Sequence, residues 1–348
     1  MAVSDAISRR NKILEVVVDS YVSTAVPVGS LAVSKKIRER LSPATIRNIM
    51  AELEDIGYIT HPHTSAGRMP TDKGYRYYVD SIMEPKQLTA DEKGFVEGVL
   101  NQEADELEDL IRRAGKIISQ LTGQASLVSF PCTKRRTFKR IELIPATKTK
   151  IYALLFTAQG LVKHSIFEVH EVIEESELSK VSRFLNEELD GLQLNDIAGH
   201  MLRKVLGESD PFQYLFKEAS ELLNMSHILD ESEERFLLEG AHHIIEQPEF
   251  REAEKVMGLL KALEGEDEIL DIMQRDLNEE KASIHIGAEN PFDDIKDCSI
   301  VMSNYRIGNQ NIGSVGVIGP TRMDYSRAVR AVEYVSNSFS NLLARLSE

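Results

Sequence analysis

The sequence of 348 residues has no tryptophan and only two cysteines, Cys132 and Cys298. Two cysteines cannot supply the disulfide framework of a small secreted protein, and they fit a reducing compartment best. No apolar run approaches the roughly 18 residues that a membrane-spanning helix requires, and the N-terminal segment lacks the apolar core of a signal peptide. These absences predict a cytoplasmic protein that has no membrane as a partner.

The chain also lacks an excess of positive charge. It has 41 Lys and Arg against 56 Asp and Glu, a net charge of −15, which argues against a protein that coats nucleic acid over its whole surface. The first 80 residues contain 11 basic and 9 acidic residues, which leaves 30 basic and 47 acidic residues for the rest. A near-neutral N-terminal part on an acidic body indicates that only the N-terminal part meets a polyanion.

Motifs for catalysis and for cofactor binding are scarce as well. His61 and His63, like the pair His242 and His243, have no cysteine or carboxylate placed to complete a metal site. The glycine-rich stretch 313–319 is neither a dinucleotide fingerprint nor a Walker A loop, so we expect a tight turn beside a strand there. The sequence therefore predicts no metal, no cofactor and no enzymatic activity.

What the sequence does contain is a pattern of three amphipathic helices near its N-terminus. A first helix is predicted over 5–21 and a second after Pro27, with Leu31, Ala32 and Ile37 turned inward. The third helix has the clearest limits. Ser42 is a favourable N-cap and Gly57 follows where a left-handed residue ends a helix. Its apolar stripe consists of Ile46, Ile49, Met50 and Leu53.

The face of this third helix opposite the stripe has the residue types that read DNA bases. Asn pairs with adenine, Arg with guanine, and small side chains contact the thymine methyl group. A helix-turn-helix places the N-terminal residues of its second helix in the major groove. The predicted DNA-binding residues of the recognition helix are Ser42, Ala44, Thr45, Arg47 and Asn48.

The following stretch, HPHTSAGRMPTDKGYRYY over 61–78, has a single carboxylate, Asp72, in an otherwise acidic chain. Its small residues allow close approach to a nucleic-acid backbone, its hydroxyl groups suit phosphate, and Arg68 is the cation that would reach it. A flexible surface loop would not explain the shortage of acid. We therefore predict a winged helix-turn-helix whose wing residues are His63, Thr64, Ser65, Gly67 and Arg68.

The body begins with a capping box from Thr89 to Glu92, which predicts the start of a long helix. Apolar residues in this helix alternate four and three apart: Leu100, Ala104, Leu107, Ile111, Ala114, Ile118 and Leu121. Such a seam is compatible with a connector helix packed on its own domain and with a dimeric coiled coil.

Strand patterns follow up to residue 170, a largely helical pattern covers 176–277, and strands return before a last helix after Asp324. A sheet that begins, is interrupted and then resumes predicts one α/β domain with an insertion. The chain length allows two or three domains in all.

Three segments closely resemble the HrcA family of heat-inducible transcription repressors. They are LSPATIRNIMAELEDIGYI over 41–59, HPHTSAGRMPTDKGYRYYVD over 61–80 and IGNQNIGSVGVIGPTRMDYSRAV over 307–329. The resemblance covers essentially the full length. It implies an α+β multidomain fold with an N-terminal winged helix-turn-helix and a GAF-like domain that carries an inserted, mostly helical dimerising domain.

The resemblance also implies a division of the chain. The expected parts are a winged-helix domain over 1–83, a linker with the start of the connector helix over 84–103, the GAF-like domain over 104–170 and 276–348, and the dimerising insertion over 171–275.

The implied function is repression of heat-shock chaperone operons by a homodimer that binds an inverted-repeat operator, CIRCE, and that the GroEL chaperonin keeps active. The alternative is a metabolite-sensing winged-helix regulator with a ligand in the GAF-like domain. An enzyme with a DNA-binding appendage is less favoured, because the sequence has no motif for it.

Overall fold

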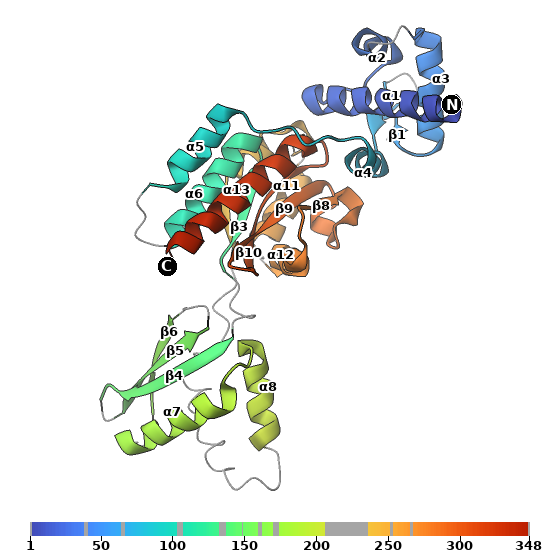
Figure 1. Cartoon of the computed structure of the whole chain (residues 1–348). Helices are drawn as coiled ribbons and strands as arrows, with labels where there is room; N and C mark the ends of the chain where they lie inside the picture. Colours follow the sequence, from blue (N-terminus) through green and yellow to red (C-terminus); the bar gives the residue numbers. More distant parts are fainter. Residues whose placement is uncertain are drawn as a thin grey trace. The chain divides into compact units, whose positions relative to one another are not determined.

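The computed structural model describes residues 2–37, 41–63, 67–102, 107–131, 137–147, 149–158, 162–169, 174–205, 236–250, 253–264 and 267–346 (Figure 1). The chain divides into two compact units. The first contains Met1–Phe130 and Arg235–Leu346, and the second contains Pro131–Glu234. None of the helices in the described ranges is both long and apolar enough to cross a membrane.

The N-terminal part, which we call the head, has helices α1 (Ala2–Thr24), α2 (Ser30–Lys36), α3 (Pro43–Asp55) and α4 (Asp72–Ser81), with the antiparallel strands β1 (Ile59–Thr60) and β2 (Met69–Pro70) before α4. The predicted limits of the third helix are confirmed. The Ser42 Oγ accepts a hydrogen bond of 3.1 Å from the Thr45 N–H, and Gly57 has a φ of +79°. The stripe residues Ile46, Met50 and Leu53 are buried in the head core.

The predicted inner face of the second helix is wrong in part. Leu31 is 60% exposed and Ala32 is also exposed, whereas Val33 and Ile37 are buried. The helix starts at Ser30, later than the sequence indicated, and has only two turns. Val33 and Ile37 are one turn apart and share a face, while Leu31 points about 200° away from Val33.

The body of the first unit is built on a five-stranded antiparallel sheet in the order β7-β3-β10-β9-β8. The strands are β3 (Ala125–Ser129), β7 (Phe236–Glu239), β8 (Ser283–Ile286), β9 (Cys298–Ile307) and β10 (Gln310–Pro320). Successive side chains of each strand point to opposite faces of this sheet. Val301 and Val317 pack toward α6 and α13, and Ile300 and Ile318 pack toward α11 and α12.

The helices of the body are α5 (Ala90–Leu100), α6 (Leu107–Thr122), α10 (His242–Ile245), α11 (Ala253–Glu264), α12 (Asp267–Arg275) and α13 (Tyr325–Leu346). The described part of the body also contains four short 3-10 helices: η1 (Pro248–Phe250), η2 (Asp276–Asn278), η3 (Gly287–Glu289) and η4 (Asp293–Ile295). The predicted capping box of Thr89 and Glu92 begins α5.

The prediction of one long connector helix with a continuous seam is wrong, because α5 ends at Leu100 and a separate helix, α6, begins at Leu107. The side chains of Ile111, Ala114 and Ile118 are fully buried within their own chain. They pack between the sheet and α13, so the apolar stripe of α6 covers the domain to which it belongs. Of the two alternatives, the structure supports a helix packed on its own domain.

The second unit contains a three-stranded antiparallel meander, β4 (Phe138–Pro145), β5 (Lys150–Thr157) and β6 (Val162–Glu168), with helices α7 (Glu175–Leu189) and α8 (Leu194–Val205). Its core joins one face of the sheet, including Ile141 and Leu155, to the inner sides of the helices, including Leu185 and Ile197.

This unit corrects the expected domain limits. The predicted insertion over 171–275 places β4, β5 and β6 in the main domain over 104–170, but in the described chain these strands pair among themselves and not with the five-stranded sheet. The segment 236–275, assigned to the insertion, belongs to the first unit, since β7 pairs with β3 and α11 and α12 pack under the sheet. The insertion therefore spans 131–234, and its described residues include a three-stranded sheet beside helices α7 and α8.

Candidate nucleic-acid interface

Helix α3 presents the predicted reading face to solvent. Ser42, Ala44, Thr45, Arg47 and Asn48 are all exposed and lie on the first two turns of the helix. The hydroxyl groups of Ser42 and Thr45 form a hydrogen bond with each other, with 2.9 Å between their oxygens. The arrangement leaves the Arg47 and Asn48 side chains as the long polar groups at this end of the helix.

A rigid support holds this face. On the opposite side of α3, Ile46 and Leu53 are fully buried, and they pack with Val33 of α2 and with Leu14 and Val17 of α1. A helix whose inner side chains are locked in a core can hold its outer side chains in one register against a ligand.

The predicted wing lies between β1 and β2, and it is only partly described. Thr64 and Ser65 lie outside the described residues, His63 is exposed, and Gly67 and Arg68 are half-buried. The backbone N–H of Arg68 donates to the Val28 carbonyl at 2.8 Å, and the Val28 N–H donates back at 2.7 Å. A Cβ at Gly67 would collide with the backbone of Pro27 and Val28, so the base of the loop needs glycine for this close approach.

Glu54, near the C-terminal end of α3, joins the wing to the helix. The Arg68 Nε donates to the Glu54 Oε2 at 2.8 Å, and the His61 Nδ1 contacts the other oxygen of the same carboxylate. The guanidinium that we expected to reach a phosphate is thus held by a carboxylate. Sequence reasoning missed this partner, since Glu54 is 14 residues from Arg68 and one of several acids on α3.

Two other cations of the stretch 61–78 also have partners within the protein. The Lys73 Nζ donates to the Ile56 carbonyl at 2.8 Å and lies over the Tyr58 ring, while Arg76 pairs with Glu289 and Asp80. Part of the basic character of this stretch therefore serves the fold. Contact of the predicted reading and wing residues with DNA stays a prediction.

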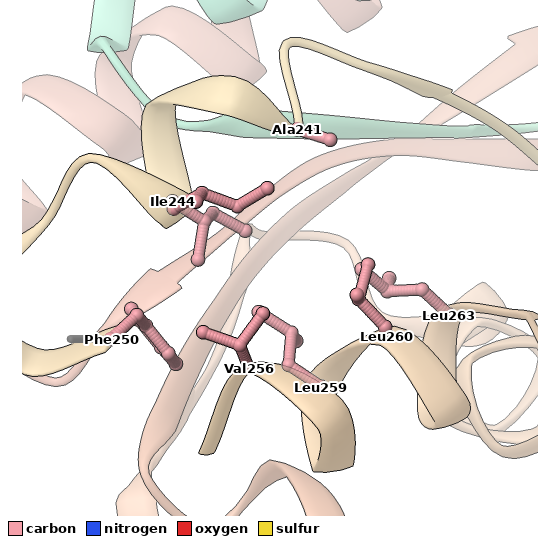
Figure 2. A pocket seen from close by; sticks show the side chains of 8 residues that line it. Ala241, Ile244, Phe250, Val256, Leu259, Leu260 and Leu263 are labelled. Carbon is pink, nitrogen blue, oxygen red and sulfur yellow. The ribbon is translucent and has the colours of Figure 1, made fainter. Parts of the chain in front are cut away.

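Two hollows formed by described residues of the body bear on a small ligand. Figure 2 shows an apolar pocket in which side chains from 241–250 face side chains of α11, Val256 and Leu259 among them. Its cavity volume is about 10 Å³, room for about one water molecule. The other is an open cleft of about 620 Å³ with a mostly polar lining that includes Asn304, Asn311 and Glu333. Metabolite pockets are usually apolar with a few polar groups, so neither hollow favours a metabolite sensor.

The described residues contain no group of three His, Cys, Asp or Glu side chains placed to hold a metal ion. The His242 and His243 rings lie 4.1 Å apart and contact each other. Burial raises the pKa of the Cys298 thiol to about 12, so this cysteine stays protonated at neutral pH and is part of the core.

Comparison with known proteins shows the family of this chain. A family model for the HrcA protein C terminal domain matches residues 108–329. The heat-inducible transcription repressor HrcA of Desulforamulus reducens is 35% identical over 338 residues, and that of Pelotomaculum thermopropionicum is 36% identical over 338 residues; each alignment covers 97% of both chains. The chain belongs to the HrcA family.

Members of the HrcA family are heat-inducible transcription repressors, and the chain is a repressor of heat-shock genes. A crystal structure described as that of a hypothetical protein at 2.2 Å resolution is 25% identical, with a TM-score of 0.59, and the alignment covers 97% of this chain and 98% of that one. The HrcA family model spans the insertion and all five strands of the five-stranded sheet, so both belong to the shared architecture of the family.

Proposed function

We propose that this HrcA chain represses chaperone operons as a homodimer, with residues 1–83 forming a winged helix-turn-helix that binds the CIRCE inverted repeat. The observation that carries the proposal is the exposed polar end of α3, with Arg47 and Asn48 held outward by a buried stripe on the other side. That combination suits insertion into a major groove, where the N-terminal residues of a helix read base edges. The loop between β1 and β2 would lie along the neighbouring backbone.

The five-stranded sheet with α5, α6 and α13 would be the GAF-like domain, and the insertion over 131–234 would hold the dimer together. The outer face of the three-stranded sheet supports this role. Ile144, Tyr152 and Ile166 face one another across the strands and are 45%, 39% and 53% exposed. Leu154 and Phe156 extend the same face.

Two charged pairs flank this apolar row. Arg140 pairs with Glu142 at 2.8 Å on one side, and Lys150 pairs with Glu168 at 3.1 Å on the other. An apolar centre with a polar rim is typical of protein interfaces. A second copy of the chain can cover the row with the same row, since a two-fold axis makes an interface self-complementary.

The GroEL chaperonin would keep the repressor in its DNA-binding state. Unfolded proteins that accumulate on heating would draw the chaperonin away, and the operons would then be transcribed. Membership in a family of heat-inducible repressors supports this part of the proposal.

The test is binding of the full chain to a fragment with the inverted repeat, with and without chaperonin, by fluorescence anisotropy. Affinity for the operator should exceed affinity for random DNA by at least about 10³-fold, and chaperonin with ATP should raise the fraction of active repressor. Equal affinity for both DNAs would contradict the proposal.

Arg68 should act on DNA through its charge. We expect Arg68→Ala to weaken binding to operator and random DNA by similar factors and to lower the salt slope by roughly one unit for each phosphate that a subunit no longer neutralises. Glu54→Gln should strengthen binding to both DNAs, because it removes the negative charge that pairs with Arg68. Titrations at several KCl concentrations measure the slope.

The control is Lys12→Ala, which removes an exposed cation of α1 outside the predicted interface. If Arg68→Ala leaves the salt slope at the parent value, Arg68 only holds the wing to α3. A decrease in affinity confined to operator DNA would make it a reader of sequence.

A further inference from the structure

Helix α4, which follows the predicted wing and strand β2, joins the head to the edge of the five-stranded sheet. The Arg76 Nε donates to the Glu289 Oε1 at 2.8 Å, and the Nη2 of the same guanidinium donates to the Glu289 Oε2 at 2.5 Å. The same guanidinium donates to the Ile284 carbonyl of edge strand β8 at 2.6 Å. A paired contact of this kind fixes direction as well as distance, since both partners are planar.

A second contact lies one turn earlier on α4. The Ala288 N–H donates to the Asp72 Oδ2 at 3.0 Å. The neighbouring Gly287 has a φ of +54°, and a Cβ there would collide with the Asp72 carboxylate. Only glycine allows both this backbone conformation and this approach. We call the contacts of Asp72 and Arg76 with Ile284 and 287–289 the latch.

The Glu289 carboxylate stays ionised at neutral pH. Partial burial favours its neutral form, but hydrogen bonds from Arg76 and from the Ile286 N–H outweigh this effect and lower its pKa. The latch thus keeps its charge pairing under physiological conditions.

The connection after the head is also attached to the body. Between α4 and α5 the chain has no regular secondary structure, and the Ser326 Oγ donates to the Glu84 carbonyl and accepts from the Lys86 N–H, each at 2.8 Å. Arg322 donates to the Val22 carbonyl at the end of α1 at 2.6 Å. The Tyr75 and Tyr325 rings lie 5.6 Å apart within one continuous core.

We infer that Arg76, supported by Asp72, is a positioning residue that fixes the direction of the head on the body, so that the two α3 helices of a dimer meet two half-sites at one set separation. This inference rests on the proposed function. Half-site spacing is a geometric property of a dimeric helix-turn-helix protein. A head that could turn freely would bind a single half-site as before. The second head of the dimer, however, would meet its half-site at a lower effective concentration, so the repeat would be bound more weakly.

The test compares Arg76→Ala with Glu289→Gln and Gly287→Ala in the full chain. The last two changes lie on the body side of the latch, so they alter no DNA-binding group of the head. Each protein is titrated with the inverted repeat, with a single half-site, and with repeats whose spacing is changed by a few base pairs. Circular dichroism and sedimentation confirm that each variant is folded and dimeric.

We expect all three variants to bind the native repeat about tenfold or more weakly than the parent, to stay within about twofold of the parent on the single half-site, and to discriminate less between spacings. The double variant Arg76→Glu with Glu289→Arg restores the ion pair but not the hydrogen bond to the Ile284 carbonyl, so it should recover only part of the spacing preference. The control Lys261→Ala removes an exposed ion pair with Asp294 elsewhere in the body and should bind like the parent.

An equal decrease in affinity for the single half-site would show that Arg76 acts on DNA or on the fold of the head, and would overturn the inference. So would Glu289→Gln and Gly287→Ala variants that keep the parent's spacing preference. A parent protein that does not distinguish the repeat from random DNA would overturn the proposed function itself, and with it this role of Arg76.

Discussion

Replacing Tyr152 and Ile166 by glutamate should turn the repressor into a monomer and lower its operator affinity by about 10²–10⁴-fold. Both side chains are exposed on the face of the three-stranded sheet that the described helices leave open, so glutamate there is hydrated in the free chain and leaves the fold intact. In a dimer the same carboxylates would lie against an apolar row and against each other, where burial of unpaired charge is costly. Two tethered heads would become two separate ones.

Sedimentation velocity gives the oligomeric state and anisotropy gives the affinity. The control is Lys180→Glu, which introduces the same charge at an exposed position of α7, on the helix that covers the other face of the sheet. This variant should remain dimeric. A folded double variant that stays dimeric would place the interface on another surface, and a parent that is monomeric at operator-binding concentrations would remove the two-fold argument altogether.

A charge placed in the predicted seam of α6 would not test where the dimer interface lies. Ile111 is fully buried between α6 and its own domain. Aspartate there would destabilise the monomer, so the disappearance of the dimer could not be assigned to an interface.

The second large effect is expected from α3. Arg47→Ala and Asn48→Ala should each weaken operator binding by about 1–3 kcal/mol for every base that the side chain reads. A two-fold dimer carries each substitution twice, so one change should cost the dimer about 2–6 kcal/mol of operator binding. Both residues are exposed and outside the core, so the thermal unfolding and circular dichroism of the variants should match those of the parent.

Titration with operator and with random DNA separates base reading from general attraction. The decrease in affinity should be large on the operator and small on random DNA, and Lys12→Ala should show neither change. If both variants bind the operator like the parent, α3 does not enter the major groove by its N-terminal end, and the assignment of the reading face is wrong.

The sequence by itself determined the features that depend on near neighbours. Ser42 at the start of α3, Gly57 after its end and the capping box of Thr89 and Glu92 were predictable, because caps and turns are formed within a few residues. The positions of β3 to β6 were also readable, since alternating or continuous apolar residues indicate a strand whatever it pairs with.

Only the tertiary structure decided which sheet each strand joins, and thus that the insertion spans 131–234. Strand patterns report which side chains are buried, and they do not name the neighbour that buries them. The same limit applies to the stripe of α6, which packs on its own sheet, and to the partners of the cations near the wing. Arg76 and Glu289 are 213 residues apart, and no local signal in a chain rich in both charges can pair them, because that contact exists only once the head and the sheet edge have folded against each other.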